Sequence, residues 1–233
     1  MEPLYFTVAF LCGMVPALFW LWFWLREDKR KPEPLYLIAI SFAVGMAIVP
    51  LALPLQKYAI ELYSGISLII VWVVIEELLK YAVGLIFIFW NKAVDEPIDL
   101  LIYMITIALG FSALENTLYM FTPLTEGQLV DSLVMTNFRF LGATLLHVLS
   151  SGTVGIFLAF AFYKSRVKKL LYGTVGLFMA IVLHGLFNFF IMNASGEAIL
   201  VVFLFVWMGV ILMFLLFEKI KLIELAHLKN TSS

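Results

Sequence analysis

The sequence has few charged residues and almost no cysteine. Only 13% of its 233 residues are Asp, Glu, Lys or Arg, about half the share found in soluble domains. The net charge of −1 gives no reason to expect a polyanionic partner such as nucleic acid. The single cysteine, Cys12, excludes an intrachain disulfide and a cysteine metal cluster. What the chain has instead is long apolar runs with a mean hydropathy of +1.05, which indicates an integral membrane protein.

Charged or Pro/Gly-containing breaks divide the apolar runs into seven expected membrane helices. We therefore predict an all-α, polytopic helical bundle in which residues 1–233 form a single membrane domain and no separate soluble domain fits. The third helix is longer than a bilayer requires, which indicates tilt or an extension beyond the hydrocarbon. The expected helices cover residues 4–25, 35–55, 63–90, 98–121, 138–163, 169–192 and 197–217.

The basic residues predict the orientation of the bundle. Lys57 and Arg139 fall on one side of the expected membrane, Lys80 falls inside a helix, and the other twelve Lys and Arg residues fall on the opposite side. Because basic residues accumulate in cytoplasmic loops, this distribution places the N-terminus outside and the C-terminus in the cytoplasm. The twelve residues are Arg26, Lys29, Arg30, Lys31, Lys92, Lys164, Arg166, Lys168, Lys169, Lys219, Lys221 and Lys229.

Six ionisable residues nevertheless lie within the expected helices. Each costs about 3 kcal/mol or more to insert into a bilayer, so such residues usually face the bundle interior and mark a functional site. Asp99, near a helix end, is expected at the membrane interface, and His227, in the C-terminal tail, is expected to be solvated. The six residues are Glu76, Glu77 and Lys80 on the third helix, Glu115 on the fourth, His147 on the fifth and His184 on the sixth.

These residues are expected at a common depth in the outer half of the membrane. A rise of about 1.5 Å per residue places Glu76, Glu115, His147 and His184 roughly 9 to 20 Å below the outer ends of their helices. Small residues around them predict close helix packing. Two acids and two imidazoles at one level suit general acid–base catalysis, or a zinc ion with an open coordination position. The small residues include Gly110, Ser112, Ala113, Gly142, Ala143, Ser150, Ser151, Gly152, Gly155 and Gly185.

Several membrane chemistries lack their motifs in this chain. There is no HExxH helix for a zincin, no GxGD for an aspartyl intramembrane protease, and no lysine on the seventh helix for a retinal Schiff base. Ser150 and Ser151 lie near His147, but GxSG is missing, which disfavours a rhomboid-like serine site. A proton- or ion-coupled transporter remains an alternative, because Glu, Lys and His inside a membrane can form a relay. A scaffold without catalytic activity is a third possibility.

Four motifs occur in order on four consecutive expected helices. They are Glu76-Glu77-x-x-Lys80, Phe111-x-x-x-Glu115-Asn116, His147 followed by Ser151-Gly152, and His184-x-x-x-Asn188. Together they resemble the PrsW family of intramembrane proteases, and Pro32-Glu33-Pro34 resembles the acidic segment of that family. PrsW proteins share a superfamily with type II CAAX prenyl endopeptidases and bacteriocin-processing proteins, in which a histidine occupies the position of Glu115.

The resemblance implies hydrolysis of a peptide bond within a single-span membrane substrate, typically the first cut in an anti-sigma factor during a bacterial envelope-stress response. In this interpretation Glu76 activates water, Glu77 and Lys80 share or compensate its charge, and His184 with Asn188 stabilises the oxyanion. Asn116 and Ser151 are candidate supporting residues.

Two mechanisms remain open at this stage. If zinc is bound, His147, His184 and one of Glu76, Glu77 or Glu115 are its expected ligands, and a remaining acid is the base. A metal-free, glutamate-dependent mechanism is the alternative. The expected outer loop 122–137 contains Glu126 and Asp131 and is interpreted either as a solvated turn or as a gate to the site.

Overall fold

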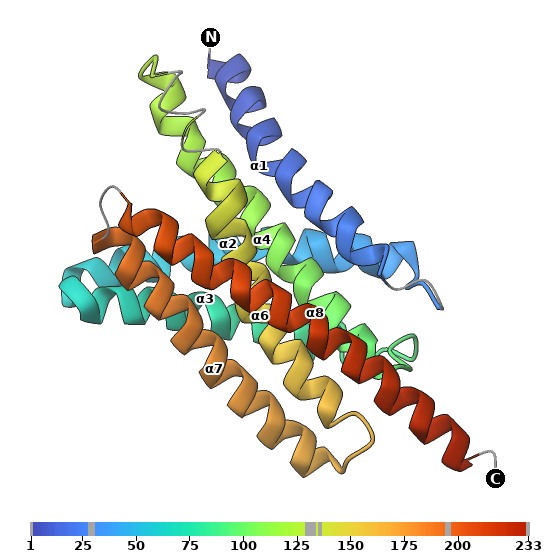
Figure 1. The fold of residues 1–233 in the computed structure, drawn as a ribbon. Helices are drawn as coiled ribbons and strands as arrows, with labels where there is room; N and C mark the ends of the chain where they lie inside the picture. Colours follow the sequence, from blue (N-terminus) through green and yellow to red (C-terminus); the bar gives the residue numbers. More distant parts are fainter. Residues whose placement is uncertain (1, 28–30, 129–133, 135–136, 194–196, 232–233) are drawn as a thin grey trace.

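The structure is a computed structural model that describes residues 2–27, 31–128, 134, 137–193 and 197–231. The interpretations placed on Lys29, Arg30 and Asp131 lie outside these residues. Within them the chain folds into helices without a strand (Figure 1). In chain order the elements are α1 (Glu2–Leu25), α2 (Leu35–Leu62), α3 (Gly65–Phe87), α4 (Pro97–Thr125), the π-helical segment η1 (Arg139–Ala143), α6 (Thr144–Phe160), α7 (Arg166–Asn193) and α8 (Ala198–Thr231).

Each expected membrane helix corresponds to one helix of the structure, with η1 and α6 forming a single continuous segment. Six of the seven are long and apolar enough to cross a membrane. The remaining helix, α3, has 23 residues and carries Glu76 at its centre, followed by Glu77 and Lys80. These charges lower its hydropathy, although its other residues are apolar. The predicted all-α, polytopic bundle is confirmed.

Several helix ends differ from the prediction. The expectation of an overlong third helix is wrong, because α3 ends at Phe87. The long helices are instead α2 and α7, with 28 residues each, α4, with 29, and α8, with 34. The last turns of α2 and α8 contain Gln, Glu and Lys, whose polarity is typical of loops. Such side chains have high helix propensity, so the helices continue beyond their apolar parts.

The centre of the bundle is α4. Of its most apolar 18 residues, 94% are buried, and a helix that is apolar on all sides needs neighbours on all sides. It packs against α1, α2 and α6, and α7 and α8 lie farther out beside α6 (Figure 1). This arrangement surrounds Phe111, the first residue of the Phe111-x-x-x-Glu115-Asn116 motif, with other helices.

Glycines allow α2 and α4 to cross with their backbones in contact. A Cβ atom on Gly45 would lie 2.1 Å from the carbonyl oxygen of Ile107, and one on Gly110 would lie 2.0 Å from that of Phe42. Gly155 on α6 meets the backbone of Leu101 in the same way. The expectation of close packing is therefore correct for Gly110 and Gly155. It is wrong for Gly185, where a Cβ atom would have no neighbour within 4 Å.

The crossing gives a stability prediction with a matched control. Gly45→Ala and Gly110→Ala each force the helices apart, because no side chain can rotate away from a backbone oxygen, and each is expected to destabilise the fold by about 1–3 kcal/mol. Gly185→Ala, also within a helix, is expected to have no such effect. The melting temperature in detergent measures the difference. Equal melting temperatures for the three variants would contradict the close crossing.

Buried polar side chains link the segment before α2 to the beginning of α4. Glu33 is only 8% exposed and accepts a hydrogen bond from the Tyr103 hydroxyl. Asp99, at the beginning of α4, accepts hydrogen bonds from the backbone N–H groups of Asp95 and Glu96 through Oδ2. Asp99 is in the first turn of α4, near the helix end as expected, and is 1% exposed because the protein covers it. Sixteen residues separate Asp99 from Glu115 on α4, or about 24 Å along the helix.

Candidate functional site

The charged residues of α3 lie on its buried face. Val73, Glu76, Glu77 and Lys80 are buried, together with Tyr81, and this spacing follows one side of a helix. Glu76 is 6% exposed, Glu77 1% and Lys80 0%. The polar face of α3 is therefore directed into the protein, which supports the expectation that intramembrane charges face the bundle interior.

The common depth expected from the sequence is present in the structure. Glu76 is eleven residues from the start of α3, Glu115 ten from the end of α4, and His184 nine from the end of α7. His147 is eight residues from the start of η1. These separations correspond to about 12 to 17 Å along each helix. The observed helix ends make the depths more similar than predicted, because α3 begins later and α4 ends later.

The structure brings six of the predicted site residues into one contact network. We call Glu76, Glu77, Lys80, Glu115, His147 and His184 the acid–histidine cluster. Its members come from α3, α4, α6 and α7, and each contacts at least one other member. The histidine rings lie edge to face with centroids 5.0 Å apart.

Glu77 is the most fully hydrogen-bonded acid of the cluster. Its Oε1 lies 2.7 Å from Lys80 Nζ and 2.8 Å from His184 Nδ1. The hydroxyls of Ser150 and Ser151 donate to its two oxygens at 3.3 and 3.4 Å. Because a carboxylate only accepts hydrogen bonds, the neutral His184 ring carries its proton on Nδ1 and leaves a lone pair on Nε2. Glu77 thus fixes both the orientation and the tautomer of His184.

Lys80 is expected to compensate the charge of Glu76, which lies one turn earlier on the same helix. The structure shows no direct ion pair between the two side chains. Its amine contacts Glu77 and lies 3.0 Å from His147 Nδ1. It also lies 4.2 Å from the centre of the Phe111 ring. Since Lys80 can only donate, the neutral His147 ring accepts at Nδ1 and carries its proton on Nε2. Lys80 therefore links Glu77 to the second histidine.

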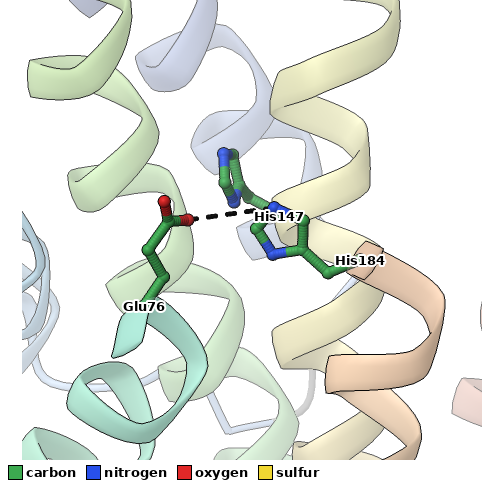
Figure 2. A group of neighbouring side chains, drawn as sticks. All are labelled: Glu76, His147 and His184. Carbon is green, nitrogen blue, oxygen red and sulfur yellow. Dashed lines mark ion pairs between the residues drawn. The ribbon is translucent and has the colours of Figure 1, made fainter. Parts of the chain in front are cut away.

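Glu76 has one bound and one free oxygen. Oε1 accepts a hydrogen bond from the side-chain amide of Gln56 at 2.8 Å. Oε2 is buried without a hydrogen-bond partner and lies 3.8 Å from His184 Nε2. A buried carboxylate oxygen without a hydrogen-bond partner destabilises the protein unless another group binds it. Here the free oxygen faces the free nitrogen of His184 (Figure 2).

Glu115 is held between a histidine and an arginine. Its Oε2 lies 3.1 Å from His147 Nε2 and forms an ion pair with Arg139. Arg139 also donates to Asn116, which in turn donates to Ser112 and Thr144 at 3.2 and 3.0 Å. Asn116 therefore holds the arginine in place.

Glu76, His147 and His184 fit a metal ion. Each offers a ligand atom, these atoms lie within 4.8 Å of one another, and all three residues are buried (Figure 2). Two imidazoles and one carboxylate form a typical catalytic zinc set. His184 Nε2 and Glu76 Oε2 are available without loss of a hydrogen bond, whereas at His147 an ion would replace Lys80 or Glu115. The geometry favours Glu76 over Glu115 as the acidic ligand.

A cavity of about 880 Å³ reaches this group from the surface. Glu76, Glu115, His147, His184 and the half-buried Asn188 line it. Much of the remaining lining is apolar, and several of these side chains are exposed on the outside of the bundle. The exposed lining residues include Leu53, Ile60, Leu118, Tyr119, Phe138 and Met192.

Two residues of the site were missed in the sequence. Arg139 was interpreted only as a marker of topology, because a basic residue at a helix end commonly has that role. Gln56 fell just beyond the expected end of the second helix. A signal was available for Arg139, since it begins the same helix as His147 and is one of only two basic residues on the expected outer side.

A family model for the PrsW family intramembrane metalloproteases matches residues 33–216. The chain belongs to the PrsW family. The matched region begins at Glu33 and contains the whole acid–histidine cluster. This PrsW protein is therefore a multi-pass membrane protease that hydrolyses peptide bonds, and the transporter and scaffold alternatives are set aside.

Three bacterial relatives named Protease PrsW show the extent of the similarity. The protein from Clostridioides difficile is 28% identical over 206 residues, 84% of each chain. That from Bacillus subtilis is 27% identical over 191 residues, 79% of this chain and 83% of the relative. That from Oceanobacillus iheyensis is 28% identical over 194 residues, with the same coverage. No solved structure matches the chain. The bacterial relatives and the apolar helices place this PrsW protein in the cytoplasmic membrane.

Proposed function

We propose that this PrsW protein cleaves its substrate with a zinc ion held by Glu76, His147 and His184. The observation that carries the proposal is the buried, unpartnered Oε2 of Glu76 beside the free Nε2 of His184. A zinc ion in this position would supply a Lewis acid that polarises the peptide carbonyl.

The remaining residues of the cluster have separate roles in this proposal. Glu77 holds His184 and is enclosed by its four donors. Glu115 faces the cavity, so it is the acid placed to accept a proton from the attacking water. Lys80 offsets the charge of Glu77. Asn188 lies one turn beyond His184 in the cavity lining and is placed to donate a hydrogen bond to the developing oxyanion.

A metal-free reaction is the second candidate, favoured by one observation. Both nitrogens of His147 already have partners, Lys80 and Glu115. In this version the free oxygen of Glu76 takes the proton from water directly, and a doubly protonated His184 donates a hydrogen bond from Nε2 to the oxyanion. Glu76 is indispensable in both versions, but chelation would inactivate only the zinc enzyme.

We further propose that the substrate is a single-span membrane protein, such as an anti-sigma factor, cut in the outer half of the membrane. Two features support the depth of the cut. The cluster is about 12 to 17 Å from the ends of its helices, and the distribution of basic residues predicts that those ends lie on the outer side. The apolar lining of the cavity fits a segment drawn from the bilayer.

Mapping the cut tests this proposal. A single-span reporter protein is incubated with the purified protease in lipid vesicles, and the product termini are determined by mass spectrometry. The expected scissile bond lies in the half of the reporter helix nearer its extracytoplasmic end, because only that half reaches the cluster. The Glu76→Gln variant controls for contaminating proteases. A cut in the cytoplasmic half by the wild-type protein alone would overturn the proposed orientation.

A further inference from the structure

Gln56 on α2 is bound directly to the acid with the free oxygen. Its amide Nε2 donates to Glu76 Oε1 at 2.8 Å, and Gln56 itself is half-buried. With one carboxylate oxygen held, rotation of the Glu76 carboxylate is restricted. The other oxygen is then directed toward His184. The contact therefore selects which oxygen of Glu76 faces the cluster.

The backbone of Gln56 is anchored to the same helix that carries Glu76. Trp72 Nε1 on α3 donates to the Gln56 carbonyl oxygen at 3.1 Å. Trp72 precedes Glu76 by one helical turn, so both side chains project from one face of α3. Gln56 is thus bound to α3 at two points, through its backbone and its side chain. The backbone contact fixes the position from which the side-chain amide reaches Glu76.

The face of α2 around Gln56 is otherwise nearly apolar. Val49, Ala52, Leu53, Gln56, Lys57 and Ile60 line the cavity at helical spacing. An amide in such a wall is unfavourable unless it is hydrogen-bonded. Leucine or methionine of similar size would fill the space without this cost, so packing alone does not account for a glutamine.

The donors on the three acids differ in charge. Glu77 is paired with the ammonium of Lys80, and Glu115 with the guanidinium of Arg139. The donor that touches Glu76 is an uncharged amide. An amide orients a carboxylate without cancelling its charge, which suits an oxygen that must bind a cation or accept a proton.

We infer that Gln56 is a positioning residue that sets the orientation of Glu76 for catalysis. This inference rests on the proposed function, and it adds a residue outside the motifs that carried the family resemblance. In the zinc version Gln56 supports a ligand. In the metal-free version it supports the base.

The test compares Gln56→Met, which keeps the volume but removes the donor, with Leu55→Met, a change at the neighbouring lipid-exposed position. Zinc affinity is measured by competition with a chromophoric chelator, and kcat and KM are measured with the reporter protein. Gln56→Met is expected to weaken zinc binding about 10- to 100-fold, the usual effect of losing a residue that orients a ligand. We expect kcat to fall by a similar factor with little change in KM. Leu55→Met is expected to match the wild type.

A second variant covers the case in which Gln56→Met fails to fold. Trp72→Phe removes the backbone anchor and leaves the Gln56 side chain, so it is expected to weaken zinc binding and lower kcat to a smaller extent. The melting temperature of each zinc-free variant identifies general loss of structure.

The outcomes separate the inference from the proposed function. If the wild type binds zinc and Gln56→Met has the same zinc affinity and kcat, the role of Gln56 is overturned and the proposed function stands. If only Trp72→Phe folds, the same result in that variant has the same meaning. A change confined to KM also overturns it, since Gln56 would then contact substrate. Active wild type without zinc overturns the zinc proposal, and the kcat comparison then tests Gln56 as the residue that positions the base.

Discussion

His184→Ala is expected to abolish cleavage of the reporter protein, with a loss of at least about a thousand-fold in kcat/KM. His184 contacts both buried acids of α3, with Nδ1 2.8 Å from Glu77 and Nε2 3.8 Å from Glu76. Its removal takes away a zinc ligand in one version of the mechanism and an oxyanion donor in the other. The loss is therefore expected whether or not a metal is bound.

His227→Ala is the matched control for this prediction. His227 is exposed near the end of α8, where its ring stacks on Tyr163, away from the cavity lining. The variant is expected to cleave at the wild-type rate, with folded yield compared by gel filtration in detergent. Wild-type turnover by His184→Ala would remove the acid–histidine cluster from the reaction.

Lys80→Met is expected to destabilise the protein by about 3–5 kcal/mol, the cost of leaving a buried charge without its partner. Lys80 is fully buried, and its amine lies 2.7 Å from Glu77, which is 1% exposed. Unfolding in a denaturing detergent titration measures the effect. Activity is expected to fall as well, because Lys80 also contacts His147.

Two further variants isolate the charge effect. In Glu77→Leu/Lys80→Met no unpaired charge remains, so much of the stability is expected to return while cleavage stays lost. Lys31→Met breaks a pair with Asp95 in which both side chains are half exposed, and such pairs contribute at most about 1 kcal/mol. Equal destabilisation by Lys80→Met and Lys31→Met would show that the buried pair has no special importance for the fold.

The depth of the site could be predicted from the sequence because it depends on helix geometry alone. Once helix ends are located within a few residues, a fixed rise per residue places Glu76, Glu115, His147 and His184 at one level. Errors in the ends were largest where polar residues continued a helix, as in the last turns of α2 and α8. The clustering was still predicted, because four independent helices agreed.

The partners within the site could not be predicted in the same way. Lys80 is one turn from both Glu76 and Glu77, and only the packing of α6 against α3 directs its amine to Glu77 and His147. Arg139 and Gln56 reach their acids from other helices, and sequence spacing carries no information about such contacts. The sequence therefore predicted the six members of the acid–histidine cluster, but neither their partners Arg139 and Gln56 nor how the charges are paired.

The metal content of the purified wild-type protein, measured together with its turnover, tests the central claim most directly. Protein purified without chelators is analysed by elemental mass spectrometry and assayed with the reporter, then stripped of metal, assayed again and reconstituted with zinc. The account predicts one zinc per chain, loss of turnover on stripping and recovery with zinc, and no stoichiometric zinc in His184→Ala. Full turnover by metal-free wild-type protein would contradict it.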